Sequence, residues 1–334
     1  MLTSYSRILG KNFKQGLPKS VELSGSTGVV TLADGELIPF DILVICTGAT
    51  WSDSFISGLH NTETARLQNM YDTTSRIQKA ASVTIVGGGV VGVELAGEII
   101  TEYPGKTVTL VHSRDRLVEY AAEKLGKAAE EILTRKGARV ILGQRAEFDA
   151  NGNPTKTESG EDIAAECSFI CTGQKPNTEF LNTGEMASSL SQSGHVLIND
   201  QLQVIQGDKV LENVFSLGDC ASYKGFRSGK AAREQADVAI KNLIAAVRGQ
   251  AITGTWRDGP APLVMSIGRD DGVLMLHNGW VMRGLPVVLG KSAREGGMLL
   301  GAWAVRSLVL PILGPWRPEK EIWEAANVNS STPQ

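Results

Sequence analysis

Cysteine is scarce in this sequence, and neither sign of charge dominates it. The 334 residues include only four cysteines, and none form a Cys-x-x-Cys pair. A disulfide framework, a zinc site and a redox-active dithiol therefore have little support. The formal net charge of −3 argues against nucleic acid as the main partner. The first residues lack the long apolar core of a signal peptide. These features predict a cytoplasmic globular protein without a metal site.

A glycine-rich stretch, residues 83–98, is the most informative part of the chain. Its first four residues are apolar and mostly β-branched, which predicts a short buried strand. Gly87, Gly89 and Gly92 then follow the G-x-G-x-x-G spacing, with Gly88 between the first two. In dinucleotide-binding folds the first glycine permits a tight turn and the second lets the backbone approach a pyrophosphate. The third lets helix and strand pack closely.

The surroundings of this stretch favour dinucleotide binding over a purely structural glycine turn. A second predicted strand, residues 107–111, follows where a βαβ unit requires it. At its end, where an acidic residue would bind the ribose of NAD, the chain has His112 and Arg114. A basic pair suits the 2′-phosphate of NADPH, and the alternative is a solvated turn without selectivity. We predict that NAD(P)H binds here and that NADPH is accepted.

The chain also contains an internal repeat. Residues 35–48 align without gaps to residues 160–173, and seven of the fourteen pairs are identical. In each copy the pattern predicts a meander and then a buried strand that ends in a cofactor-binding turn. The two turns are Thr47-Gly48 and Thr172-Gly173. Two hairpins that are similar by chance are the alternative. The repeat predicts a duplicated nucleotide-binding fold.

A third motif follows the repeat. An apolar run, residues 213–217, ends at Gly218-Asp219, and a helix is predicted from about Ser228 to Val247. In this order the motif resembles the flavin-binding return of the two-dinucleotide-binding flavoproteins. The resemblance implies that Asp219 holds the ribityl chain of FAD. It also implies that the helix N-terminus points at the isoalloxazine ring, where the helix dipole favours the negative charge of reduced flavin. The alternative is an aspartate that only caps a helix.

Six short sequence segments indicate a particular family among these flavoproteins. The segments are residues 5–7, 86–98, 101–104, 108–113, 133–137 and 265–273. They are similar to the apoptosis-inducing-factor-like flavoproteins, in particular to the branch of ferroptosis-suppressor NAD(P)H–quinone reductases. The resemblance covers most of residues 1–275. It implies the Rossmann-like α/β fold of the pyridine nucleotide reductases, with FAD and NAD(P)H as cofactors. It also implies a quinone-like electron acceptor, reduced in a membrane-adjacent pocket.

Two catalytic residues are implied by the same resemblance. A glutamate at the position of Glu94 lies near the nicotinamide and the flavin in that family. The alternative is an ordinary glutamate near the start of a helix, where the dipole favours it. Lys230 opens the helix after the Gly-Asp motif, where a cation would stabilise anionic reduced flavin. The alternative is an exposed surface lysine.

The repeat reveals a departure from the family. In the second copy the phosphate turn at Gly87 precedes the Thr-Gly turn, whereas its equivalent in the first copy would fall before residue 1. We therefore expect the first FAD-binding half to be truncated and FAD to be held weakly. The predicted organisation is an FAD-domain remnant (1–50), a connection (51–80), an NAD(P)-binding domain (81–175), a return to the FAD domain (176–250) and a C-terminal region (251–334).

We predict an NAD(P)H-dependent FAD oxidoreductase of the quinone reductase type. The alternative is a non-catalytic NAD(P)-binding fragment or signalling protein that no longer retains FAD. A disulfide reductase is disfavoured, because Cys167 and Cys171 in one strand would lie about 13 Å apart. The apolar stretch 298–316 is short for a membrane span of ~20 residues. It would lie on a membrane surface or pack on the core.

Overall fold

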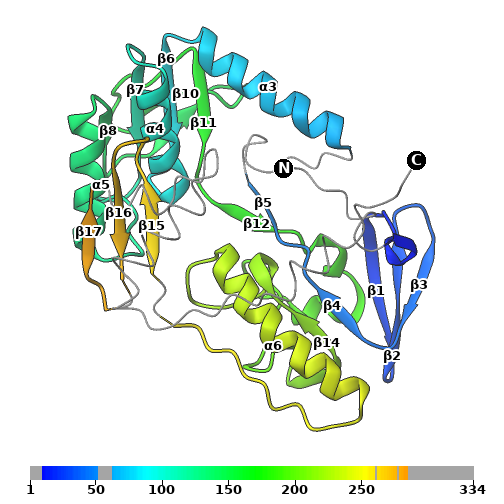
Figure 1. Cartoon of the computed structure of the whole chain (residues 1–334). Helices are drawn as coiled ribbons and strands as arrows, with labels where there is room; N and C mark the ends of the chain where they lie inside the picture. Colours follow the sequence, from blue (N-terminus) through cyan, green and yellow to red (C-terminus); the bar gives the residue numbers. More distant parts are fainter. Residues whose placement is uncertain (1–9, 52–61, 260–261, 277, 285–334) are drawn as a thin grey trace, which may run out of the picture.

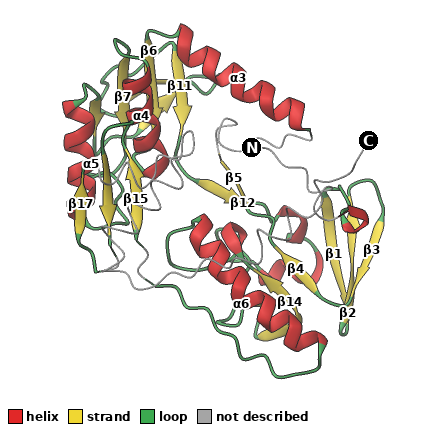
Figure 2. Cartoon of the chain, viewed as in Figure 1, coloured by secondary structure: helices red, strands yellow, loops and turns green. Residues whose placement is uncertain are grey.

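A computed structural model describes residues 10–51, 62–259, 262–276 and 278–284. These residues form two α/β units that correspond to the two copies of the repeat, together with a three-stranded meander and a further three-stranded sheet (Figures 1 and 2). A long helix, α3 (Glu63–Lys79), precedes the second unit, and Thr62 caps it by accepting the N–H of Ala65.

The second unit is built around a parallel sheet with the strand order β11-β6-β7-β8. Helix α4 connects β6 to β7, and α5 connects β7 to β8. Strand β6 forms where predicted, because its apolar residues are buried on both faces of the sheet. The elements are β6 (Ser82–Val86), α4 (Val90–Glu102), β7 (Thr107–Val111), α5 (Glu123–Arg135), β8 (Arg139–Ile141), β9 (Ala146–Phe148), β10 (Pro154–Thr157) and β11 (Cys167–Ile170).

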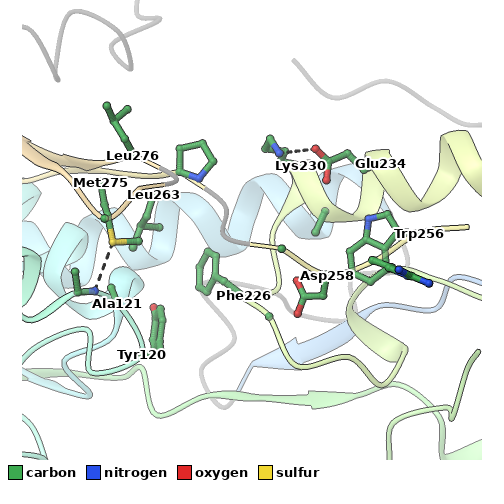
Figure 3. A pocket seen from close by; sticks show the side chains of 17 residues that line it. Tyr120, Ala121, Phe226, Lys230, Glu234, Trp256, Asp258, Leu263, Met275 and Leu276 are labelled. Atoms are coloured by element: carbon green, nitrogen blue, oxygen red, sulfur yellow. Dashed lines mark hydrogen bonds and ion pairs between the residues drawn. The ribbon is translucent and has the colours of Figure 1, made fainter. Parts of the chain in front are cut away.

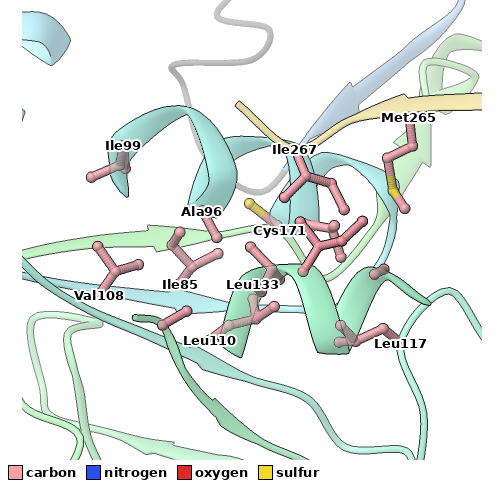
Figure 4. Close-up of a cluster of buried hydrophobic side chains, with 14 of the residues drawn as sticks. Ile85, Ala96, Ile99, Val108, Leu110, Leu117, Leu133, Cys171, Met265 and Ile267 are labelled. Carbon is pink, nitrogen blue, oxygen red and sulfur yellow. The ribbon is translucent and has the colours of Figure 1, made fainter. Parts of the chain in front are cut away.

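Buried aliphatic side chains on this sheet form the main core (Figure 4). Ile85 and Leu110 come from adjacent strands, and Leu133 comes from α5, and all three are fully buried. The sheet β15 (Leu263–Ser266), β16 (Gly272–Met275) and β17 (Val281–Arg283) packs on the same core. A Cβ on Gly97 of α4 would lie 2.7 Å from the Cα of Ile267, so this glycine lets the two backbones approach.

The first unit joins segments that are far apart in the sequence. Its sheet has the order β13-β14-β4, in which β4 and β14 are parallel. Helix α6 forms as predicted and lies over this sheet (Figure 1). The strands are β1 (Pro18–Ser24), β2 (Thr27–Leu32) and β3 (Leu37–Phe40) of the meander, then β4 (Leu43–Ile45), β13 (Gln203–Gln206) and β14 (Lys209–Ser216). The helices are η1 (Gly10–Asn12), η2 (Glu179–Leu181), η3 (Gly184–Ser189), η4 (Gly218–Cys220) and α6 (Gly229–Val247).

The two Thr-Gly turns lead into the strands that connect the units. Strand β5 (Ala49–Trp51) follows the first turn and β12 (Gln174–Pro176) follows the second, and they pair antiparallel in the middle of the molecule (Figure 1). Asn177 ties the first turn to the second connection. Its Nδ2 donates to the carbonyl oxygen of Thr47, and its backbone N–H donates to that of Gly48, both at 2.9 Å. The two copies of the repeat therefore meet through equivalent turns.

The two units differ at one sheet edge. In the second unit β11 pairs in parallel with β6, the strand that leads into Gly87. In the first unit the equivalent strand β4 pairs with β14, and no other strand of the described segments pairs with it. Within those segments, the phosphate turn of the second unit thus has no counterpart beside β4.

One strand ends earlier than the sequence predicts. The buried strand expected to run to the first Thr-Gly turn is β4, which ends at Ile45, so Cys46 is exposed. The other three cysteines are buried, and all four are free thiols. Helix α5 begins only at Glu123, because residues 117–120 form turns and Arg116 donates to the backbone carbonyls of Glu119 and Ala121.

No helix within the described ranges is both long enough and apolar enough to cross a membrane. The apolar stretch 298–316, predicted to contact a membrane or the core, lies outside those ranges.

Candidate functional site

The turn between β6 and α4 has the geometry of a phosphate-binding turn. Gly87 has a φ of +117°, which favours glycine. A Cβ on Gly92 would lie 1.8 Å from the carbonyl oxygen of Gly87, so α4 can pack on the turn only with glycine there. Gly89 is the N-cap of α4, and a Cβ on it would meet nothing within 4 Å. The N-terminus of α4 is therefore open to an anion.

His112 lies against this turn. Its Nδ1 accepts the N–H of Gly88 at 3.1 Å, so the neutral ring carries its proton on Nε2. Burial lowers the pKa of His112, Glu119 opposes this shift and Arg114 adds to it, so the ring stays neutral at neutral pH. Nε2 is buried without a hydrogen-bond partner. A cofactor oxygen at the turn would satisfy this donor.

Arg114 lies just beyond His112 and is exposed. Its Nε is 3.0 Å from Oε2 of Glu119, and both side chains are in contact with solvent. This ion pair holds a guanidinium near the end of β7, where the sequence predicted recognition of a 2′-phosphate. An exposed pair of this kind is worth at most about 1 kcal/mol, so a phosphate can compete for the arginine.

We expect Arg114→Ala to weaken NADPH binding roughly fivefold and to leave NADH binding nearly unchanged, because only NADPH brings the extra phosphate charge. Glu119→Gln is the matched variant, since it releases Arg114 from its ion pair and should strengthen NADPH binding. Calorimetry with both nucleotides measures these differences. Equal losses for NADPH and NADH in Arg114→Ala would show that this arginine does not contact the 2′-phosphate.

The Gly-Asp motif lies between β14 and α6. Gly218 has a φ of +76°, and its N–H donates to Oε1 of Gln235 at 2.7 Å, so the turn is fixed to α6. Asp219 is half-buried, and burial raises the pKa of its carboxyl while the charge of Arg227 opposes that shift. Ser228 caps α6 by accepting the N–H of Ala231 at 3.2 Å. A carboxylate and a helix N-terminus therefore belong to one site.

Several buried polar atoms around this motif have no hydrogen-bond partner, and they are Thr47 Oγ1, Tyr223 OH, Arg227 Nε and Gln235 Nε2. Burial, followed by the charge of Asp219, raises the pKa of Tyr223 to about 12, so its hydroxyl remains a donor. Sequence reasoning selected Thr47 but missed Tyr223 and Arg227. Neither residue belongs to a motif, and only the packing around Asp219 reveals them.

The predicted catalytic residues have different surroundings. Glu94 is half-buried on α4, and its Oε1 accepts the N–H of Ser266 at 3.2 Å, which ties it to the end of β15. Lys230 is half-exposed on α6 and forms an ion pair with Glu234 one turn later. At the second Thr-Gly turn Thr172 is exposed, and Gly173 has a φ of +123°.

A cavity of about 510 Å³ lies between the second unit, α6 and the sheet β15-β16 (Figure 3). Apolar and aromatic side chains dominate its wall, with a few charged groups at α6 and at residues 257–258. The labelled lining residues are Tyr120, Ala121, Phe226, Lys230, Glu234, Trp256, Asp258, Leu263, Met275 and Leu276. Sequence reasoning selected only Lys230 among them.

Two aromatic contacts place this cavity between the candidate cofactor sites. Tyr120 and Phe226 stack with centroids 5.2 Å apart, and the hydroxyl of Tyr120 accepts the N–H of Val90 at 3.4 Å, beside the phosphate turn. Trp256 meets Tyr223 edge to face at 5.2 Å, beside the Gly-Asp motif. The cavity therefore adjoins both candidate cofactor sites.

The residues present fit a nicotinamide nucleotide and the ribityl chain and ring of FAD, whereas the described segments offer no second phosphate turn beside β4 for the FAD pyrophosphate. The open N-terminus of α4 and the unpartnered Nε2 of His112 suit the pyrophosphate of a nicotinamide nucleotide. Unpartnered donors on Tyr223 and Arg227 beside Asp219 suit a flavin, which has hydroxyl donors on its ribityl chain and several acceptors on its ring.

Comparison with known proteins identifies relatives of this chain. Residues 5–242 match the family described as pyridine nucleotide-disulphide oxidoreductase. Over 298 residues the chain is 32% identical to ferroptosis suppressor protein 1 of Homo sapiens, covering 86% of this chain and 78% of that protein. It is 28% identical to the FAD-dependent oxidoreductase FVFD30 of Flammulina velutipes (87% and 86% covered). It is 30% identical to apoptosis-inducing factor homolog B of Dictyostelium discoideum (81% and 75% covered). The resemblance predicted from the sequence is confirmed.

Solved structures confirm the fold class. A ferredoxin reductase for the CYP199A2 system of Rhodopseudomonas palustris aligns with a TM-score of 0.61 at 19% identity, covering 83% of this chain and 68% of that one. The CoADR-RHD of Bacillus anthracis aligns with a TM-score of 0.60 at 15% identity over 82% of this chain, which spans about half (51%) of that structure. At these identities the likeness concerns the fold alone.

Proposed function

Because this chain belongs to the pyridine nucleotide-disulphide oxidoreductase family and is an oxidoreductase that uses FAD and NAD(P)H, we propose that it reduces a quinone-like acceptor in the cavity beside α6. The position of that cavity carries the proposal. Tyr120 links it to the N-terminus of α4, and Trp256 links it to the residues around Asp219. A flat acceptor in the cavity would lie next to both electron-carrying groups.

The lining of the cavity suits a quinone. A quinone ring is flat and apolar and has two carbonyl acceptors, and aromatic walls favour such rings. Phe226 and Trp256 offer ring surfaces, while Leu263 and Met275 form an aliphatic wall. Lys230 lies at the wall on α6 and can donate to a quinone carbonyl, because its ion pair with Glu234 is exposed and weak. This gives Lys230 a role at the acceptor.

The chain positions the cofactors and contributes little acid–base chemistry. The phosphate turn at Gly87–Gly92 would hold NAD(P)H by its pyrophosphate, and Glu94, whose carboxylate accepts the N–H of Ser266, would lie near the nicotinamide. Asp219 would accept hydrogen bonds from the ribityl hydroxyls. When bound, FAD would supply the redox chemistry between NAD(P)H and the acceptor. The acceptor is a small molecule. The cytoplasmic location and a peripheral membrane contact stay predictions.

We expect Ala121→Trp to raise the KM for a short-chain naphthoquinone at least ~5-fold, because the indole fills acceptor space worth about 1 kcal/mol of binding. Reduction of ferricyanide, a small outer-sphere acceptor that needs no cavity, should change less than twofold by the same reasoning. Steady-state kinetics with NADPH as donor measures both. Ala121 lines the cavity, is partly buried and packs against the main core, so thermal unfolding is measured to confirm that the variant folds.

Ala164→Trp is the control, because Ala164 is exposed and does not line the cavity. An unchanged KM for the quinone in Ala121→Trp, or an equal rise in the control, would remove this cavity as the acceptor site. A chain that binds NADPH but reduces neither acceptor would support the non-catalytic alternative.

A further inference from the structure

Arg227 occupies an unusual place for a cation. It immediately precedes Ser228, the N-cap of α6, and no acidic residue lies in the first turn of that helix. A helix N-terminus carries a partial positive charge, so a cation there is unfavourable unless an anion or an electron-rich group offsets it. Arg227 forms no ion pair within the described part of the chain. Its position therefore needs an explanation.

The hydrogen bonds of Arg227 leave part of its guanidinium unsatisfied. One terminal nitrogen, Nη2, donates to the carbonyl oxygen of Ala221 at 3.3 Å, and Cζ lies 4.9 Å from the centroid of the Tyr223 ring. These contacts fix the group, yet Nε is buried and donates to nothing. An unsatisfied buried donor costs about 1–3 kcal/mol, and more on a charged group. The hydroxyl of Tyr223 is a second buried donor without a partner in the same cluster.

The charged groups around Arg227 place it at the Gly-Asp motif. Its charge lowers the pKa of Asp219 against the effect of burial, and it adds to the effect of burial in lowering the pKa of His195. It also lowers the pKa of Tyr223, where burial and Asp219 act in the opposite sense. Arg227 is thus close enough to Asp219 to interact through space, but the two do not form an ion pair.

We propose that Arg227, with Tyr223 beside it, donates hydrogen bonds to the acceptor-rich edge of the bound flavin ring and stabilises the negative charge that the ring gains on reduction. This inference rests on the proposed flavin site at Asp219. The flavin ring then supplies the acceptors that the two buried donors lack, and its reduction supplies the negative charge that offsets a cation at a helix N-terminus. Lys230, predicted from the sequence for this role, has a half-exposed side chain that is already paired with Glu234.

Sulfite binding to the chain of residues 1–334 loaded with FAD tests this role without turnover. Sulfite adds to N5 of oxidised flavin, where the sulfur lone pair forms an N–S bond. The π electrons of the N5=C4a bond are displaced to the N1–C2=O edge as a negative charge, so adduct stability reports how well the protein stabilises that charge. Arg227→Met should raise the dissociation constant of sulfite at least ~10-fold, about 1.4 kcal/mol. Arg227→Lys keeps the charge and should stay within roughly threefold of the unchanged protein. Lys230→Met should change it less than roughly twofold, because the side chain of Lys230 is half-exposed and solvent screens its charge.

Thermal unfolding and the affinity for oxidised FAD are measured on every variant. If Arg227→Met does not fold, Tyr223→Phe removes one donor at nearly constant shape and should still weaken sulfite binding roughly threefold. Unchanged sulfite affinity in folded, FAD-bound Arg227→Met and Tyr223→Phe would overturn the proposal. An effect of Lys230→Met as large as that of Arg227→Met would also overturn it.

A separate variant distinguishes failure of the flavin site from failure of the role of Arg227. If Asp219→Ala leaves FAD affinity unchanged, the flavin does not bind at Asp219 and the site on which this inference rests is wrong. If Asp219→Ala loses FAD while Arg227→Met keeps normal sulfite affinity, the site stands and only the role of Arg227 fails. If the chain without any substitution binds no FAD, both the proposed flavin site and the proposed role of Arg227 are wrong.

Discussion

Gly89→Val should weaken the binding of both NADH and NADPH at least ~10-fold, about 1.4 kcal/mol, while the protein remains folded. A Cβ on Gly89 meets no protein atom within 4 Å, so the valine side chain would project into open space. That space lies at the N-terminus of α4, where the pyrophosphate must approach the backbone. The backbone at Gly89 has a φ of −73°, which valine can adopt. Isothermal titration calorimetry on the folded variant measures the loss.

Gly92→Ala is the informative comparison, because it affects the same turn in a different way. Its Cβ would lie 1.8 Å from the carbonyl oxygen of Gly87, so the turn or the helix must move. We expect this variant to lose thermal stability together with nucleotide binding, whereas Gly89→Val loses binding alone. Normal calorimetric affinity in folded Gly89→Val would show that the nucleotide does not approach the turn here.

Asp219→Ala should lower the affinity for FAD about 10- to 100-fold, since hydrogen bonds to a charged group are worth about 1.5–3 kcal/mol. Asp219 is half-buried in the turn between β14 and α6. The pKa of its carboxyl is raised by burial, so acidification toward that pKa should also release flavin. The bound flavin is measured by its visible absorbance after dialysis, as a function of pH.

Asp219→Asn is the matched control for Asp219→Ala, because it removes the charge and keeps the shape of the side chain. It keeps one acceptor and the size of the side chain, so FAD affinity should fall less than in Asp219→Ala, and its pH dependence below neutrality should flatten. If Asp219→Ala retains a full complement of FAD, the ribityl chain is not held by this residue.

Much of the second unit could be predicted from the sequence because its signals are local. The β-branched run before Gly87, the glycine spacing and the strand 107–111 lie within one βαβ unit, and the structure places them as expected. The repeat also predicted the two Thr-Gly turns, which lead into the paired strands β5 and β12.

The acceptor cavity could not be predicted, because its wall is assembled from distant segments. Tyr120 lies after β7, Phe226 before α6 and Met275 in β16, and no spacing in the sequence links them. Arg227 was missed for a related reason, since a single basic residue before a helix gives no pattern. Its unsatisfied Nε and its position over Tyr223 become visible only when the chain is folded.

An anaerobic titration of the chain of residues 1–334 loaded with FAD tests the central claim most directly. We expect NADPH to bleach the visible absorbance of the bound flavin in proportion to the amount added, and a naphthoquinone to restore it. This outcome would show that the turn at Gly87, the site at Asp219 and the cavity beside α6 act together as one NAD(P)H–quinone oxidoreductase. Flavin absorbance that NADPH leaves unchanged, or that a quinone does not restore once it is bleached, would contradict this account.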